Sequence, residues 1–196
     1  MYGFSLAAQG HLPEALVNIR QCQELDPVAA PRRFELAMCY NWMRQYDQAI
    51  AEAQKALALN PDLVRAYGEL GLALSQKAQY ENALTELRKA VDLSKRHPRM
   101  LGLLGYAYVA AGKKAEAQKV LGELNGLAQQ HQYSSSFAIA RIHAALDQKD
   151  QAFEWLRKAC DERESQVIFV KVDPTLDNLR SDPRFTQILR DMGLPP

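Results

Sequence analysis

The sequence predicts an all-α protein, a solenoid of about four and a half helix–turn–helix repeats followed by a C-terminal capping segment. Small residues recur every 34 residues, and this period is the length of one helix–turn–helix unit in a repeat array. Within a unit, apolar residues return at the spacing of one buried helical face. One small-residue column contains Ala15, Ala49, Ala83 and Ala117. A second column contains Gly3, Ala37, Gly71 and Gly105.

The composition fits a folded, helix-rich chain and argues against two classes of partner. Of the 196 residues, 47% are hydrophobic and 24% are charged, and the formal net charge is +1. Because no global basic field would attract nucleic acid or an anionic membrane, we expect neither as a partner. The longest apolar run, Met100–Ala111, is too short to cross a bilayer. Three dispersed cysteines, Cys22, Cys39 and Cys160, predict reduced thiols and a cytoplasmic location.

The repeat array is predicted to occupy residues 1–163, and its first repeat, residues 1–27, is incomplete. The second helix of this repeat, about Pro13–Leu25, is whole, but the first, about Tyr2–Gln9, has roughly half the expected length. Because a terminal repeat normally carries a polar outer face, which this one lacks, we interpret it as cut from a longer array.

The second repeat, residues 30–61, places Pro31 in the first turn of a helix and Asp47 at the start of the next, where a carboxylate suits the helix dipole. The third repeat, residues 62–98, is the most regular copy, and Gly71 and Ala83 are predicted to meet at its helix crossing.

Two further repeats complete the predicted array. The fourth covers residues 99–131, and the loop before it carries Lys95, Arg96 and Arg99, which we interpret as a solvated turn. The fifth, residues 133–163, follows a break at which Ser134–Ser136 are candidate N-caps.

Residues 164–196 are predicted to cap the array. The β-branched, apolar run Gln166–Val172 predicts an extended segment. Short helices are expected near Pro174–Leu179 and Pro183–Met192, because each follows an aspartate that can act as N-cap. The residues expected to be buried against the fifth repeat are Phe169, Phe185, Ile188 and Leu189.

The columns resemble those of the tetratricopeptide repeat family, most clearly in Leu104–Ala117, LGYAYVAAGKKAEA, which carries Leu-Gly, Tyr, Gly and Ala in the family's order. The similarity extends over about Tyr2–Ala159, although the family's tryptophan near each repeat start is absent, since Trp42 and Trp155 lie elsewhere. The resemblance implies a right-handed solenoid that binds proteins on the concave face formed by its first helices. The tail, Lys149–Leu194, is similar to the end of repeat arrays in bacterial multidomain regulators.

Placing the sequence in this register predicts a concave groove that is apolar and aromatic at its centre, with arginines at its edge. The predicted groove residues are Phe34, Met38, Asn41, Arg65, Gly68, Leu72, Ser75, Arg99, Gly102, Tyr106, Phe137 and Arg141. Gly68 and Gly102 would let a ligand backbone approach closely. An amphipathic helix or apolar peptide, with an acidic residue facing Arg65 or Arg99, would fit this surface. The alternative is that segments of the protein itself pack on this face.

The residues of the family's carboxylate clamp for chaperone tails are missing, because the lysine column is occupied by Phe34, Gly68, Gly102 and Phe137. Catalytic, metal and cofactor sites are not predicted either. The histidines His11, His97, His131 and His143 lie in separate repeats without triad or metal-ligand spacing.

We therefore predict a non-catalytic scaffold that binds a protein or peptide segment without a cofactor, as a module of a larger regulatory protein. One alternative is a regulatory module that forms a homodimer, or packs on an adjacent effector domain, through its apolar N-terminal edge. An enzyme with a site assembled across repeats is the third and weakest hypothesis.

Overall fold

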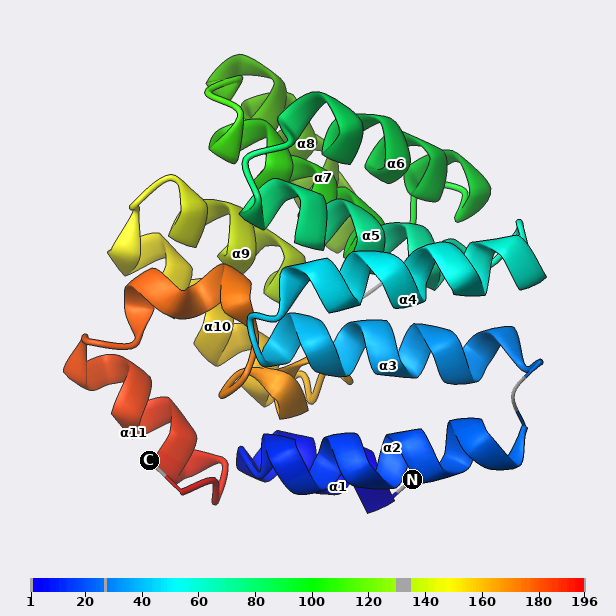
Figure 1. Ribbon diagram of the computed structural model, residues 1–196. Coiled ribbons are helices and arrows are strands. Elements are labelled where there is room, and N and C mark those ends of the chain that lie inside the picture. Colours follow the sequence, from blue (N-terminus) through cyan, green and yellow to red (C-terminus); the bar gives the residue numbers. More distant parts are fainter. Residues whose placement is uncertain (1, 27, 130–134, 196) are drawn as a thin grey trace.

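The computed structural model describes residues 2–26, 28–129 and 135–195, and it confirms the all-α solenoid (Figure 1). The α-helices are α1 (Tyr2–Gln9), α2 (Leu12–Leu25), α3 (Ala30–Trp42), α4 (Tyr46–Leu59), α5 (Val64–Gln76), α6 (Tyr80–Leu93), α7 (Pro98–Ala110), α8 (Lys114–Gln129), α9 (Ser136–Ala145), α10 (Lys149–Asp161) and α11 (Pro183–Asp191). Two 3₁₀ helices, η1 (Val167–Phe169) and η2 (Pro174–Leu179), lie between α10 and α11.

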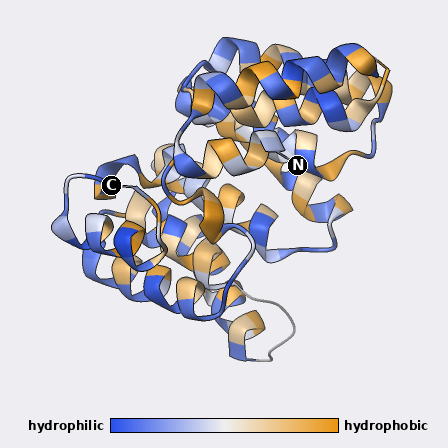
Figure 2. Cartoon of the chain, turned by 90° about the horizontal axis from the view of Figure 1, so that it is seen from below, coloured by the Kyte–Doolittle hydropathy of each residue, from blue (hydrophilic) through white to orange (hydrophobic). Residues whose placement is uncertain are grey.

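Consecutive helices pack as pairs, and each pair stacks on the next. The first helices α3, α5, α7 and α9 contact one another in series and form the inner layer. The chain then turns back, so that its C-terminal part lies beside α1 and α2 (Figure 1). Hydrophobic and hydrophilic residues are interspersed along the chain, as expected for helices that bury one face (Figure 2). Helix α1 is short, with 8 residues against 13 in α3, as predicted.

The turn between the helices of each pair repeats with the sequence period. The left-handed residues of these turns are Gly10, Arg44, Ala78, Gly112 and Asp147. The next backbone N–H donates to the carbonyl five residues earlier, as from Gln79 to Leu74 at 2.9 Å. This bond is characteristic of the Schellman helix end, which favours glycine. In three of the five turns the left-handed residue is not glycine, and its Cβ makes this backbone conformation unfavourable.

The turn at Ala78 generates a stability prediction. Ala78 has a φ of 57° and is exposed, so replacing it by glycine removes a backbone clash and no buried contact. We expect Ala78→Gly to raise the free energy of unfolding by about 1 kcal/mol, measured by urea denaturation. The matched control is Gly112→Ala, which should lower it by a similar amount. A lower stability for Ala78→Gly would contradict the proposed strain.

The small-residue columns mark close helix contacts. A Cβ added at Gly71 would lie 2.4 Å from Leu87 Cγ, and one added at Gly105 would lie 2.3 Å from Ile142 Cδ1. Glycine is thus required where another helix presses on the backbone. The atoms nearest to Gly71 belong to Leu87 rather than to Ala83, the predicted partner. Ala83 is instead part of a cluster with Leu70 and Leu74.

The N-terminus of α9 is satisfied by an unexpected residue. Ser135 is the N-cap, but its side chain donates to the Leu124 carbonyl instead of capping the helix. The Glu164 carboxylate accepts from the backbone N–H groups of Ser136 and Phe137, at 2.7 and 3.3 Å. Burial raises the pKa of Glu164, and these two hydrogen bonds partly offset that effect. The other candidate cap, Ser134, lies outside the described residues.

The capping segment differs from the prediction at its start. Residues Gln166–Val172 are not extended: they contain η1 and turns, with Val170 N–H bonded to Val167 O at 2.9 Å. No strand lies beside this run within the described residues, so its backbone groups pair locally. The two predicted short helices are confirmed, with Asp173 and Asp182 as their N-caps.

Three of the four side chains predicted to pack on the fifth repeat do so. Phe185, Ile188 and Leu189 share a buried cluster with residues of α9 and α10. The prediction for Phe169 was wrong, because its ring packs against Phe4 and Trp42 at the opposite end of the array.

Candidate functional site

The predicted groove residues come together on the inner faces of α3, α5, α7 and α9, but most of them are covered. The covering segment, residues 164–182, contains η1 and η2 and crosses the concave face; we refer to it as the strap. The buried members of the predicted set are Phe34, Met38, Asn41, Gly68, Leu72, Ser75, Gly102, Phe137 and Arg141. Arg65 is exposed, and Arg99 and Tyr106 are half-buried. The strap is therefore an intramolecular occupant of the predicted groove.

A buried ion pair fixes the strap to α9. Arg141 donates from Nη2 to Asp173 Oδ2 at 2.8 Å and from Nε to Thr175 Oγ1 at 2.9 Å. Asp173 Oδ1 accepts from the backbone and the hydroxyl of Thr175, which caps η2. Burial opposes ionisation of Asp173, but the Arg141 charge and these hydrogen bonds prevail, and they hold its pKa below the usual value. Arg141 therefore anchors the strap instead of facing a ligand in the groove.

A second polar contact lies deeper in the groove. Arg99 Nη2 lies 3.4 Å from Glu69 Oε1, and Asn41 Nδ2 donates to Glu69 Oε2 at 2.9 Å. Burial lowers the pKa of Arg99, and the nearby Glu69 carboxylate partly offsets this. Arg99 was predicted to face an acidic ligand, and Glu69 of the same protein takes that place.

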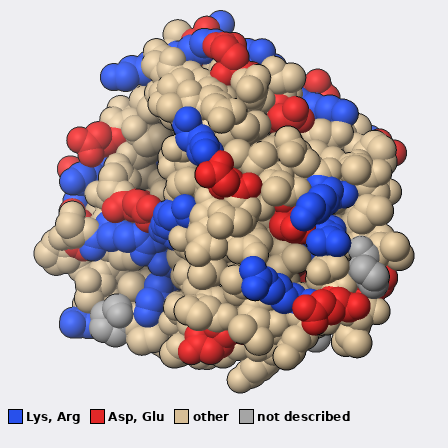
Figure 3. Space-filling view, in the orientation of Figure 1, with Lys and Arg blue, Asp and Glu red and all other residues tan. Residues whose placement is uncertain are grey.

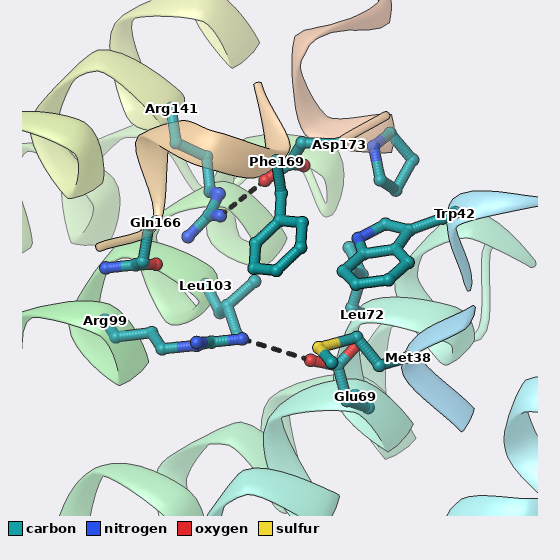
Figure 4. Close-up of a pocket in the computed structure, with 11 residues that line it drawn as sticks. Met38, Trp42, Glu69, Leu72, Arg99, Leu103, Arg141, Gln166, Phe169 and Asp173 are labelled. Carbon is teal, nitrogen blue, oxygen red and sulfur yellow. Dashed lines mark hydrogen bonds and ion pairs between the residues drawn. The ribbon is translucent and has the colours of Figure 1, made fainter. Parts of the chain in front are cut away.

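A small cavity of about 30 Å³ remains between these two ion pairs. Figure 4 shows the side chains of Arg141, Gln166 and Arg99 around it, with Phe169 against Trp42. Arg141 Nη1 and Gln166 Oε1 are buried without a hydrogen-bond partner in the described residues. A volume of this size holds about two water molecules. The cavity is therefore too small for a side chain of a partner protein.

The N-terminal end of the groove is closed by aromatic side chains. Phe169 stacks on Trp42 with the ring centroids 4.6 Å apart and an interplanar angle of 27°. Phe4 contacts both rings edge-on, with each centroid distance 6.2 Å. Arg44, at the left-handed turn after α3, donates to the Val172 carbonyl at 2.7 Å and forms an ion pair with Asp177. These contacts join the first two repeats to the strap.

Two predicted groove residues have a structural role instead of a role in ligand access. A Cβ at Gly102 would lie 2.7 Å from Ala138 Cβ and 2.9 Å from Ala138 Cα, so glycine is required where α7 crosses α9. A Cβ at Gly68 would lie 3.1 Å from Met100 Sδ and 3.2 Å from Leu103 Cδ1. The interpretation that these glycines leave room for a ligand backbone was wrong, since neighbouring helices occupy that space.

One part of the concave face stays open, at the C-terminal ends of the first helices. This open groove has a volume of about 360 Å³ and is lined by Gln76, Tyr106, Val109, Ala110, Ala145, Pro174, Thr175, Asp177 and Asn178. Gln76 donates to the Tyr106 hydroxyl at 3.1 Å, and burial raises the pKa of Tyr106 to about 12. The inner helices form one wall and η2 forms the other, so the groove presents both apolar and hydrogen-bonding groups.

The histidines and potential metal ligands of the described residues lie apart from one another. Within it, no group of three His, Cys, Asp or Glu side chains could hold a metal ion. His143 Nδ1 contacts Gln148, and His97 Nδ1 accepts from the Arg99 backbone as the cap of α7. His131 lies outside the described residues. No helix among residues 2–26, 28–129 and 135–195 is long and apolar enough to cross a membrane.

Surface charge is mixed on the face that Figure 3 shows, where Lys and Arg lie among Asp and Glu without a large area of one sign. Several of these charges are paired across neighbouring repeats, as Lys113 is with Glu81 at 2.7 Å. This distribution agrees with the near-neutral net charge.

The sequence did not predict the roles of Trp42, Glu69 and Asp173. Asp173 was recognised as an N-cap, but its pairing with Arg141 depends on the path of the strap. A signal was present for Glu69: it is a charged residue between Gly68 and Leu70, two residues whose columns are buried in the stacked array. A carboxylate at such a position needs a partner.

We expect Asp173→Asn to lower the free energy of unfolding by about 3–5 kcal/mol near neutral pH, because Arg141 stays buried without its counter-charge. The control Asp177→Asn removes two partly exposed ion pairs, with Arg44 and Arg180, and should cost at most about 1 kcal/mol for each. Urea denaturation of both variants measures the difference.

The same pair predicts a dependence on pH. Since the pKa of Asp173 is lowered on folding, its contribution is present above the usual aspartate pKa of about 3.9 and is lost as the pH falls through the folded-state pKa. The difference between the wild type and Asp173→Asn should shrink below about pH 4. A constant difference would contradict the ionic role.

Models of the tetratricopeptide repeat match residues 30–63, 73–136 and 133–166, which together make up well over half of the chain. No curated protein matches the chain significantly.

Several solved structures share the architecture. A thermophilic TPR protein of Thermus thermophilus has a TM-score of 0.67 at 20% identity, covering 89% of this chain and 95% of that chain. Pseudomonas aeruginosa pilF has a TM-score of 0.58 at 19% identity, covering 97% of this chain and 88% of that chain. A Rap protein complexed with competence and sporulation factor has a TM-score of 0.67 at 17% identity, covering 98% of this chain but 62% of that chain. At these identities the likeness establishes the fold alone.

Proposed function

The chain belongs to the tetratricopeptide repeat family, and we propose that it is a non-catalytic scaffold that binds a segment of a partner protein in the open groove beside Tyr106. The observation that carries the proposal is this groove of about 360 Å³ on the concave face. Its inner wall consists of side chains from α5, α7 and α9, the helices that the repeat presents to ligands. The middle of the concave face, around Met38, Leu72 and Arg141, is covered by the strap.

The lining of the open groove suggests the kind of segment that would bind. Tyr106 and Val109 supply apolar area, while Gln76, Thr175 and Asn178 supply hydrogen-bonding groups along the rim. A short extended or helical peptide that carries one or two apolar side chains fits such a surface. The resemblance of the tail to arrays in multidomain regulators supports the further proposal that this scaffold is a module of a larger regulatory protein.

The proposal can be tested with a random peptide library selected against the purified chain. Peptides selected by the wild type should bind Tyr106→Ala and Val109→Glu at least about tenfold more weakly, because both substitutions remove apolar contact area in the groove. Thr85→Ala is the matched control, since Thr85 is exposed on α6 and does not line the groove. Isothermal titration calorimetry measures the affinities, and equal binding by all variants would exclude the open groove.

Self-association through the N-terminal edge is the second candidate. Four large apolar residues of the first repeat and the loop after it are exposed: Tyr2 at 68%, Val17 at 54%, Leu25 at 87% and Val28 at 74%. Val17 and Leu25 are eight residues apart and therefore lie on the same face of α2. Exposed apolar residues gathered on one edge favour an interface with a second copy or with an adjacent domain.

If this edge mediates a dimer, light scattering should show a mass that rises with protein concentration, and Leu25→Glu should lower the association constant at least about tenfold. Leu93→Glu provides a matched control. Leu93 lies on α6, where it occupies the same repeat position as Leu25 on α2, and it is 39% exposed. A monomer at all concentrations, or equal effects of the two substitutions, would argue against the N-terminal edge.

A further inference from the structure

The strap contacts the two ends of the array with different sides. On one side, Val167, Val170, Leu176 and Leu179 belong to the buried cluster of the fifth repeat. On the other side, Val172 belongs to the cluster built mainly by the first two repeats, and Phe169 packs against it. The strap therefore connects the two ends of the solenoid and closes it into a ring. We refer to the contact of Phe169 and Val172 with the first two repeats as the seam.

The two sides differ in how deeply they are buried. The four side chains on the fifth repeat are almost inaccessible to solvent, and the Arg141–Asp173 pair lies beside them. At the seam, Val172 is buried, but Phe169 is only half-buried, its neighbour Ile168 is 48% exposed, and the Arg44–Asp177 ion pair is partly exposed. Exposed ion pairs hold segments weakly and are screened by salt. The contacts of the strap with the fifth repeat are therefore stronger than its contacts with the first two repeats.

Opening the seam would uncover a surface with defined chemistry. Trp42 presents the aromatic face on which Phe169 now stacks, as Figure 4 shows, and Phe4 adds an edge contact to the Phe169 ring. Arg44 presents a guanidinium that now binds the Val172 carbonyl and the Asp177 carboxylate. Such a surface would bind a peptide whose aromatic residue stacks on Trp42 and whose acidic residue pairs with Arg44.

We propose that Trp42, Phe4 and Arg44 form a second docking site for a protein segment that carries an aromatic and an acidic side chain, and that Phe169 and Asp177 of the strap are its intramolecular occupants. The ligand class is the one assigned under the proposed function, a protein segment, but Trp42, Phe4 and Arg44 do not line the open groove. The partner competes with the strap for this site. The Arg44–Asp177 ion pair and the stacking of Phe169 on Trp42 therefore lower the apparent affinity of the protein for the partner.

The probe is the synthetic peptide QVIFVKVDPTLDNL, which is residues 166–179 of the strap itself. It is titrated into the full chain and into the double variant Phe169→Ala/Asp177→Asn, which leaves Trp42, Phe4 and Arg44 unchanged. We expect the peptide to bind the double variant at least about tenfold more tightly than the wild type, because the internal competitor is weakened. A peptide with alanine in place of its phenylalanine should lose this gain, and adding Arg44→Gln to the double variant should reduce it.

Equal affinity of the wild type and the folded double variant for the peptide, or equal binding of the two peptides, would overturn the proposal. Hydrogen exchange of the unmodified chain provides an independent check should the double variant fail to fold. Amides of the seam, in residues 166–172 and in α1, should exchange at least about tenfold faster than those of α9 and α10; equal protection would mean that the seam does not open on its own. Peptides selected for the open groove should bind the single variant Phe169→Ala and the wild type alike, because Phe169 does not line that groove, so failure at the seam is distinguishable from failure of the proposed function.

Discussion

The interaction between Arg141 and Asp173 determines which surfaces of this protein are accessible. It places a charged pair at the centre of the concave face and holds the strap there, with Thr175 and the η2 cap completing the hydrogen bonds. A buried charge pair of this kind is costly to break, because either partner left alone stays buried without compensation. The strap therefore covers the middle of the inner layer, while the open groove and, by our proposal, the seam serve for binding other proteins.

The architecture could be predicted from the sequence because its cause is local and repeated. Each repeat ends its first helix with the same left-handed turn, and each crossing demands a small residue at the same position, as at Gly71 and Gly105. Those demands recur every 34 or 35 residues, so they appear as columns in the sequence. The prolines after Asp173 and Asp182 likewise act within a few residues, and the helices that follow were predicted with nearly their observed bounds.

The candidate site could be predicted only in part, because its final form depends on contacts between distant segments. The repeat register located Met38, Leu72, Tyr106 and Arg141 on the inner face, and that assignment agrees with the walls of the two concave cavities. Nothing in the local pattern specifies that a strap far along the chain returns to α3, or that Phe169 stacks on Trp42. The run Gln166–Val172 illustrates the same limit: its β-branched residues favour a strand, but no neighbouring strand is present in the described structure, so the backbone forms turns.

The closed ring also explains why the groove, apart from the exposed Arg65 at its edge, has lost the positive charge that its sequence predicted. An array with an uncovered concave face would present Arg99 at its edge and Arg141 at its centre to an acidic ligand. Here Glu69 and Asp173 occupy those positions, so the attraction for anions is satisfied internally. What remains at the open groove is a surface of moderate polarity around Tyr106, one wall of which is the strap itself. Ligand selection there would depend on η2 as much as on the repeats, and a change in the strap would alter binding without touching any inner helix.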